Sequence, residues 1–289
     1  MASDKLQIHR RAKLKDGQLL MGFSGWMDGG NISTGTVKFL VEQLDAQKLA
    51  DIEPEGFYIY NFPGSMELTS MFRPHTRIRD GLVELCDMPR NTFFLDEEND
   101  LILFAGKEPH LRWAEYADCI FSVCHQFDVK TIYFIGSVAG LVPHTRQPRF
   151  SCSVSDEELK EKMNRYGVRL SNYEGPASIV THLTTRAKQE QVSMTTFVAE
   201  IPAYVQGHNP GCISAVVKLL ANVLNLHLDI EDLRRIGEEF ERKLSEIVEA
   251  QPELASHIGR LEEDYDNEVF DTEMGDLKDW LEQQGIRVD

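Results

Sequence analysis

Short apolar runs alternate with stretches of helical spacing along most of the chain. The apolar, β-branched or aromatic runs predict strands at Gln18–Phe23, Phe57–Asn61, Leu101–Ala105, Thr131–Ile135 and Met194–Ala199. Spacing of three and four predicts helices at Asn31–Lys48, Leu111–Phe127, Pro176–Gln189 and Cys212–Leu226. Arg77–Asp80 and Leu82–Cys86 meet near Gly81 and predict a hairpin. We therefore expect an α/β fold with a mostly parallel sheet flanked by helices.

The last part of the chain has a different pattern. Within Ile230–Ala250, apolar residues recur at steps of three and four on a charged background: Leu233, Ile236, Phe240, Leu244 and Ile247. Pro252 should end this helix, and the stretch from Leu254 to Tyr265 should fold back as a helical hairpin. Trp280 and Leu281 then supply a third apolar element. The expected organisation is an α/β body at 1–228 and an acidic helical extension at 229–289, acting as a lid or interaction arm.

Charge and composition narrow the classes of partner. The net charge is −17, and the last 61 residues hold 20 acidic but only 7 basic side chains. Such a surface repels phosphate backbones, so we expect no nucleic-acid partner. No apolar run approaches the ~20 residues that cross a bilayer, and the polar start lacks a signal-peptide core, so we expect no membrane partner. Five scattered cysteines indicate reduced thiols and a cytoplasmic location.

Four segments open into glycines, prolines and polar side chains where a predicted strand ends. Because the carboxyl ends of parallel strands line one crevice, these segments predict a shared pocket. Its candidate residues are Ser24, Trp26, Asp28 and Asn31 from the first segment, Lys107 and Glu108 from the second, His144 and Arg146 from the third, and Glu200, Tyr204 and Asn209 from the fourth.

Each candidate in this pocket also has an ordinary structural explanation. Backbone amides of the first segment can hold an anion, or Asp28 and Asn31 can simply cap the next helix. His144 and Arg146 can act as acid/base and anion clamp, or belong to an ordinary polar loop. Glu200 can be buried with a raised pKa, or can pair with an arginine.

Several well-known chemistries lack their sequence signatures. The nine histidines show no ligand spacing, so we assign no metal. Ser24 and Ser137 lack the Gly-x-Ser-x-Gly elbow of many serine hydrolases. The first segment is neither Gly-x-Gly-x-x-Gly nor a phosphate loop, and no cofactor is assigned. Cys119 and Cys124 lie in a helical pattern and are expected in the core.

The segments, taken in order, resemble the proteasome assembly chaperone 2 family. The resemblance covers roughly Leu19 to Leu233, and it rests on Gly25-Trp26-Met27-Asp28-Gly29-Gly30, Phe72-Arg73-Pro74, Gly106-Lys107-Glu108-Pro109 with Trp113, Val142-Pro143-His144-Thr145-Arg146, and Ile201-Pro202-Ala203-Tyr204-Val205 before Asn209-Pro210. The tail is similar to that of the bacterial branch with a C-terminal helical extension, through Pro252-Glu253-Leu254-Ala255, Leu261-Glu262-Glu263-Asp264-Tyr265-Asp266 and Trp280-Leu281-Glu282-Gln283-Gln284.

The resemblance implies a fold similar to nucleoside phosphorylases, homo-oligomers, and an assembly-chaperone-like role. Two positions depart from the family pattern. Val288 stands where proteasome-docking tails carry Tyr, and Ala203 stands where the family pattern Val-Pro-His-Tyr carries His. Docking on a proteasome through the tail, and an acid/base role at the fourth segment, are therefore not expected.

Two functions remain open from the sequence. The first is a non-enzymatic assembly factor or scaffold that forms homo-oligomers and binds a protein partner through its C-terminal helices. The second is a small-molecule enzyme on a phosphorylase-like fold, namely a phosphorylase, hydrolase or ATP-dependent ligase, that uses the pocket at the strand ends. Fold alone does not separate them.

Overall fold

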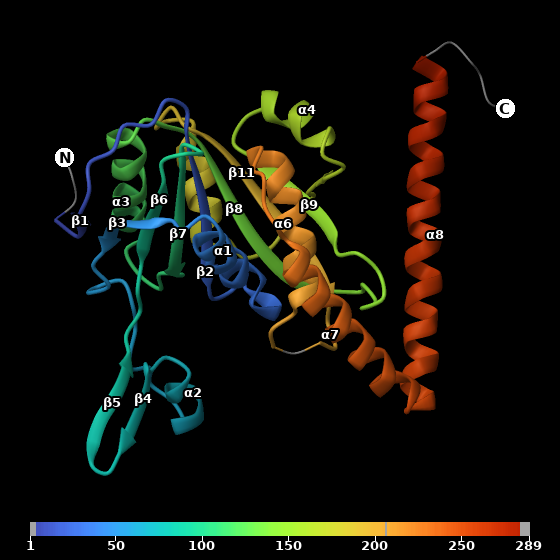
Figure 1. Cartoon of the computed structure of the whole chain (residues 1–289), viewed down its shortest axis with the longest axis horizontal. Helices are drawn as coiled ribbons and strands as arrows, with labels where there is room; N and C mark the ends of the chain where they lie inside the picture. The colour runs from blue at the N-terminus through green and yellow to red at the C-terminus, as the bar shows by residue number, and fades with distance from the viewer. Residues whose placement is uncertain (1–3, 206, 284–289) are drawn as a thin grey trace.

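A nine-stranded mixed sheet forms the centre of the molecule (Figure 1). The computed structural model describes residues 4–205 and 207–283, with side chains described as far as 270. The strands follow the order β1-β3-β6-β7-β2-β8-β11-β9-β10 across the sheet. Their bounds are β1 Leu6–Ile8, β2 Gly17–Ser24, β3 Gln47–Ile52, β6 Thr92–Asp96, β7 Leu101–Lys107, β8 Val129–Gly140, β9 Arg149–Val154, β10 Arg169–Leu170 and β11 Ser193–Pro202.

The four central strands, β7, β2, β8 and β11, are mutually parallel, which confirms the expected α/β core. The sheet is antiparallel where β6 meets β7 and where β9 meets β11. The sequence patterns did not predict β3, β6 or β9. Among the described residues no helix combines the length and apolar composition needed to cross a bilayer.

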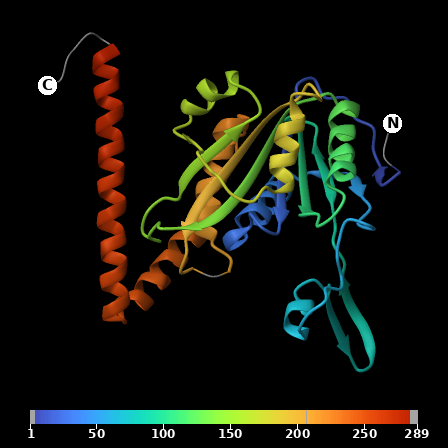
Figure 2. The same ribbon diagram turned by 180° about the vertical axis from the view of Figure 1, so that it is seen from behind.

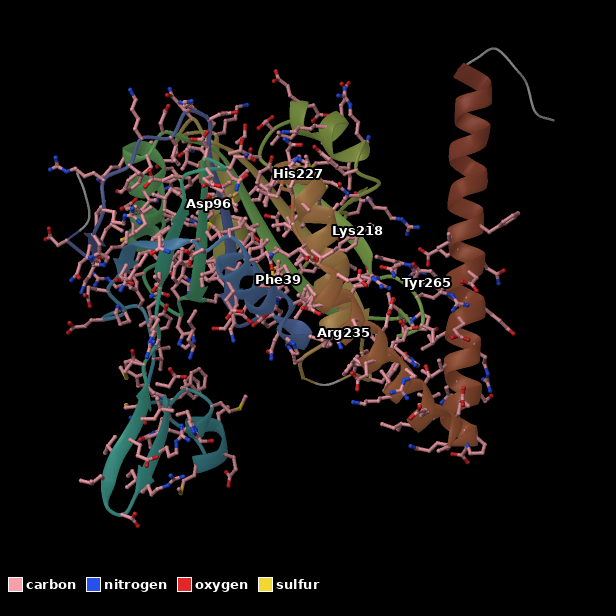
Figure 3. All side chains as sticks on the ribbon, viewed as in Figure 1. Phe39, Asp96, Lys218, His227, Arg235 and Tyr265 are labelled. Carbon is pink, nitrogen blue, oxygen red and sulfur yellow. The ribbon has the colours of Figure 1, made fainter. Side chains whose placement is uncertain are left out.

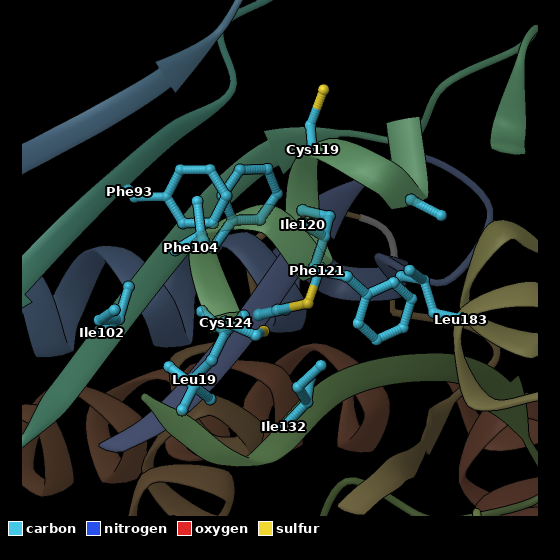
Figure 4. Close-up of a cluster of buried hydrophobic side chains, with 14 of the residues drawn as sticks. Leu19, Phe93, Ile102, Phe104, Cys119, Ile120, Phe121, Cys124, Ile132 and Leu183 are labelled. Carbon is cyan, nitrogen blue, oxygen red and sulfur yellow. The ribbon is translucent and has the colours of Figure 1, made fainter. Parts of the chain in front are cut away.

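Helices cover both faces of the sheet, as expected. One face carries α1 Ile32–Gln43 and α6 Pro210–Leu224, and the other carries α3 Trp113–Gln126 and α5 Ile179–Ala187. Alternate residues of the central strands serve the two cores: Leu19 packs with α3 and α5, and Leu20 with α1 and α6. Figure 4 shows Leu19, Phe104, Ile132 and Phe121 in the first of these cores.

Two expectations in the first third of the chain are wrong. Helix α1 ends at Gln43 rather than Lys48, because Asp45 turns the chain with a φ of 47° and Gln47 starts β3. Phe57–Asn61 forms no strand. Phe57 is nevertheless buried, with its ring centroid 5.1 Å from that of Tyr116, so its apolar character serves packing rather than pairing.

A small arm, which we define as residues 62–90, projects away from the sheet (Figures 1 and 2). It contains α2 Met66–Ser70, β4 His75–Arg79 and β5 Leu82–Asp87. The two strands form the hairpin that the sequence predicts, with Gly81 at the turn in a left-handed conformation (φ 79°). At its root, Phe72 packs edge-on against His110 of the body, 5.7 Å between ring centroids.

Two further helices, α7 Glu231–Glu249 and α8 Pro252–Gln283, follow the body, and a short helix, α4 Glu158–Asn164, lies after β9. The amphipathic helix α7, its end before Pro252 and the reversal of the chain there are confirmed, but the separate third element is wrong. Pro252 starts one continuous helix, because proline is favoured in a first helical turn. Trp280 and Leu281 lie on this same helix, with side chains outside the described part. In both views α8 runs beside the body, and it contacts the body through Glu262, Asp266 and Glu268.

Helix α7 is packed closely against α6. A Cβ atom added at Gly237 would lie 2.9 Å from the Cα of Gly211, so the two backbones meet without intervening side chains. The division into a body at 1–228 and an extension at 229–289 stays a prediction; α6 ends at Leu224 and α7 begins at Glu231.

Candidate functional site

The four predicted loops leave the sheet at one edge and touch one another. Glu108 links the first two, because its amide donates to Ser24 O and its Oε2 accepts from the Trp26 amide, both at 2.9 Å. The first loop reaches the fourth where the Asn209 amide donates to Gly30 O at 3.0 Å. Parallel order in the sheet therefore gathers these loops, as the sequence predicts.

Asp28 supports the helix that follows it. Its Oδ1 accepts from the Thr34 amide at 3.1 Å, and its Oδ2 accepts from the Thr34 hydroxyl at 2.8 Å. Burial raises the pKa of Asp28, although these hydrogen bonds oppose that change. Asn31 makes no capping hydrogen bond with its side chain and sits in the left-handed region at φ 54°. Of the two capping candidates, only Asp28 supports the first turn of α1.

His144 has both ring nitrogens engaged within the chain. The Tyr204 hydroxyl accepts from the His144 amide at 2.7 Å and lies 2.8 Å from Nδ1. Nε2 lies 3.1 Å from Ser245 Oγ. In the tautomer with the ring proton on Nε2, the Tyr204 hydroxyl donates to Nδ1 and Nε2 donates to Ser245 Oγ. Burial lowers the pKa of His144. The side chain thus links the sheet edge to α7.

Arg146 binds α8. Its Nε and Nη2 donate to Asp266 Oδ1 and Oδ2, each at 2.8 Å, and its Nη1 lies 3.7 Å from Glu262. Close by, Arg149 pairs with Glu268 at 2.6 Å, and its guanidinium lies 4.5 Å from the Tyr265 ring centroid. Figure 3 shows Tyr265 on the side of α8 that faces the body.

Two candidates of the fourth loop lie in regular structure. Asn209 is buried and caps α6, with Oδ1 accepting from the Cys212 amide at 3.1 Å. Glu200 lies within β11, opposite Arg149 of β9 in the register. Gly136 to Gly140, expected in a loop, belong to β8 and pair with β11.

The predicted single pocket is divided between two hollows. Ser24 and Lys107 line a hollow of about 730 Å³ beside the arm. His144, Arg146 and Asn209 line another, of about 480 Å³, between the sheet edge and α7. Asp28, Asn31, Glu200 and Tyr204 line neither, and Trp26 projects outward with 67% of its surface exposed.

The larger hollow contains basic residues that the strand-end argument missed. Arg73, His75 and Arg90 come from the arm, outside the four segments from which the pocket was predicted. Only Arg73 carried a sequence signal, through the Phe72-Arg73-Pro74 motif. Contact between the arm and the sheet is a tertiary feature, which explains why periodicity could not find it.

Other reactive groups are buried or dispersed. Within the described ranges, no group of three or more His, Cys, Asp or Glu side chains is placed to hold a metal ion. Cys119 and Cys124 lie in the core as expected, and burial raises the pKa of the Cys212 thiol to about 12. A thiol of that kind stays protonated and is a poor nucleophile.

Solved structures of other proteins share this arrangement of strands and helices. No curated protein matches the sequence. A Mycobacterium tuberculosis protein of unknown function has a similar structure, with a TM-score of 0.82 and 21% identity over 94% of this chain and 92% of that one. A Mycobacterium tuberculosis proteasome-assembly chaperone homologue has a TM-score of 0.71 and 25% identity, over 83% of this chain and 99% of that one.

A more distant structure shares the fold. PbaB of Pyrococcus furiosus, an archaeal proteasome activator, gives a TM-score of 0.62 and 19% identity over 86% of this chain and 99% of that one. The sequence itself matches the PAC2 family model over residues 22–248, which includes the arm, all four loops and nearly all of α7. The chain therefore belongs to the PAC2 family.

Proposed function

We propose that this protein is an assembly factor or scaffold that forms homo-oligomers, and that the arm is its main contact surface. The observation that carries the proposal is the concentration of exposed apolar side chains on the arm. Met66, Met71 and Leu82 have 85%, 77% and 73% of their surface exposed. The same segment also exposes Phe62, Leu68, Ile78, Val83 and Met88.

A patch of this kind is unusual for a surface that meets only water. Contiguous exposed apolar surface marks contact sites, and an isolated two-stranded hairpin is marginal in water. The root of the arm is packed against the body through Phe72 and His110. A contact that covers the apolar side chains would stabilise the arm.

We propose a second copy of the chain as the occupant of this surface. The arm is electrically balanced, with four acidic and four Lys or Arg residues within 62–90, although the chain as a whole carries −17. It is therefore a part of the molecule that can approach a second copy without strong repulsion. Closed rotational symmetry is the usual result of such self-association.

The internal use of the candidate catalytic groups supports a scaffold over an enzyme. A general acid or base must reach the substrate proton. Both carboxylate oxygens of Asp28 are bonded to Thr34, and both ring nitrogens of His144 are bonded to Tyr204 and Ser245. The small-molecule enzyme therefore has less support than the scaffold. Among the similar structures, the names proteasome-assembly chaperone homologue and proteasome activator are in keeping with this proposal.

Light scattering on the full chain tests the proposal. We expect a mass that is a multiple of the 33.0 kDa monomer at micromolar concentration. The double variant Met71→Glu with Leu82→Glu should dissociate, since it places charges inside an apolar contact. The matched control is Leu141→Glu, because Leu141 is equally exposed (72%) but lies outside the arm.

Two outcomes would contradict the proposal. A monomeric wild type would contradict the proposed homo-oligomer. An arm variant that stays as oligomeric as the control would show that the arm is not the contact surface. Nucleoside phosphorolysis or ATP hydrolysis by the purified chain would favour the enzyme instead.

A further inference from the structure

The hollow of about 730 Å³ lies at the junction of the arm with the sheet. Ser24 and Lys107, at the carboxyl ends of β2 and β7, form one side. Arg73 and Arg90, at the two ends of the hairpin segment, form another. The volume is in the range of small-molecule sites, which are about 300–1,000 Å³.

The hollow carries positive charge that the chain does not neutralise. Among residues with described side chains, Arg73, Arg90 and Lys107 have no ion-pair partner within 4.0 Å. Lys107 Nζ lies 5.9 Å from the ring centroid of Tyr58, a cation–π contact that leaves its charge without a counter-ion. Asp87 is the one carboxylate in the described lining. Three permanent cations therefore share a hollow with a single anion.

The arginines of the arm differ in their partners. Elsewhere on the arm, Arg77 and Arg79 both lie 3.7 Å from oxygens of Glu84. Asp51 lines a neighbouring hollow with Arg90, yet it pairs with Lys48 at 2.6 Å instead. In a protein with a net charge of −17, carboxylates are abundant, and yet these three cations line one hollow without an ion pair to any described side chain.

Uncharged groups complete a surface suited to a phosphate-bearing molecule. The Ser24 hydroxyl makes no hydrogen bond within the described residues, and Thr34 brings the first turn of α1 to the rim. Phe94 and Met88 supply apolar contact beside the cations. Arginine forks match phosphate oxygens in pairs, and lysine adds a point charge.

We infer that this hollow binds a small molecule through a phosphate group, held by Arg73, Arg90 and Lys107. The phosphate would occupy the space between the arm and the ends of β2 and β7. Because the arm supplies two of the three cations, the bound molecule would also hold the arm against the sheet. This inference does not depend on the scaffold function.

Calorimetric titration of the full chain tests the inference with three probes: inorganic phosphate, adenosine 5′-monophosphate and adenosine. We expect the monophosphate to bind and adenosine not to bind, since the phosphate carries the recognition. If inorganic phosphate binds as tightly as the monophosphate, the ligand is the free anion. If inorganic phosphate binds more weakly than the monophosphate, the ligand is an organic phosphate. Both results support the site.

The variants Arg73→Gln and Arg90→Gln should each weaken binding about tenfold, because each loses a charge-assisted hydrogen bond. Arg77→Gln is the matched control: it removes an arginine of the same arm that pairs with Glu84 and does not line the hollow. Light scattering on each variant separates a lost site from a changed oligomer. Absence of binding by both phosphate probes at millimolar concentration, or equal loss in the Arg77→Gln control, would overturn the inference.

Discussion

Asp266 of α8 accepts two hydrogen bonds from Arg146, from Nε to Oδ1 and from Nη2 to Oδ2, each at 2.8 Å. The two residues are 120 positions apart, and the pair joins the loop after β8 to the final helix. Glu268, which pairs with Arg149 at 2.6 Å, extends this contact along α8. Opposite charges thus dock the acidic helix on a basic sheet edge.

Removing the charge of Asp266 should loosen α8. In Asp266→Asn, we expect faster amide hydrogen exchange in α8 near residues 258–268, with little change in the sheet. Asp264→Asn is the control, since Asp264 lies on the same helix and makes no ion pair with any described side chain. Salt should loosen the wild type in the same way, because exposed pairs are screened. Equal exchange in both variants would contradict this role.

Acid should release the same contact. The hydrogen bond from Arg146 lowers the pKa of Asp266, so the unfolded chain binds this proton more readily than the folded one. The stabilisation that Asp266 contributes is complete above the ordinary Asp pKa of about 4. It is lost as the pH falls through the pKa that Asp266 has in the folded protein. The rate of proteolysis of α8 at decreasing pH measures the loss of this contribution. The same pH profile in wild type and in Asp266→Asn would contradict the prediction.

The linkage through His144 should respond at a higher pH. Burial lowers the pKa of His144. The stabilisation from its contacts is therefore complete above the ordinary His pKa of about 6.5, and it is lost as the pH falls toward the pKa of His144 in the folded protein. Protonation of Nδ1 removes its ability to accept from Tyr204. We expect exchange near Ser245 of α7 to rise on acidification.

Nuclear magnetic resonance titration checks the pKa of His144 directly. Tyr204→Phe should move it upward toward the ordinary value, because Nδ1 loses the hydroxyl that stabilises its unprotonated form. Tyr173→Phe, at an exposed position, is the control. A His144 pKa at or above 6.5 in the wild type would contradict the prediction.

Close approach of α6 and α7 makes Gly237 sensitive to any side chain. In Gly237→Ala the new methyl group would lie 2.9 Å from the Gly211 Cα, so the helices must separate. We expect a loss of about 1–3 kcal/mol in the free energy of unfolding, measured with denaturant. Gly259→Ala has open space on α8 and should be neutral or stabilising. Similar values for the two variants would show that the contact is not tight.

The buried side chain of Asn91 holds two tyrosine hydroxyls. Its Oδ1 lies 2.8 Å from the hydroxyl of Tyr58 and 3.0 Å from that of Tyr116, and burial raises the pKa of both tyrosines. Asn91→Leu should cost about 1–3 kcal/mol, because the Tyr116 hydroxyl loses Asn91 Oδ1. The Tyr58 hydroxyl keeps the Lys107 carbonyl oxygen as an acceptor at 2.8 Å. Chemical denaturation measures the loss, and Asn172→Leu at an exposed site is the control. An unchanged stability would contradict the network.

Residue patterns along the chain are sufficient to predict the local elements of the core and the edge at which the loops gather. The apolar runs Leu101–Ala105 and Thr131–Ile135 lie in β7 and β8, and the spacing of Leu233, Phe240 and Leu244 identifies α7. These features follow from periodicity, which reports whether a residue faces apolar or polar surroundings. Parallel order then brings the strand ends to one edge whatever the loops contain.

The role of each polar side chain at that edge depends on contacts made in the folded protein. Asp28 and His144 are ordinary candidates for catalysis in sequence, yet Thr34, Tyr204 and Ser245 take up their hydrogen-bonding capacity. Conversely, Arg73 and Arg90 have no strand-end signal and still share a hollow with Lys107. Sequence spacing specifies neighbours along the chain, whereas charge pairing and cavity lining depend on contacts between distant segments, which exist only once the chain has folded.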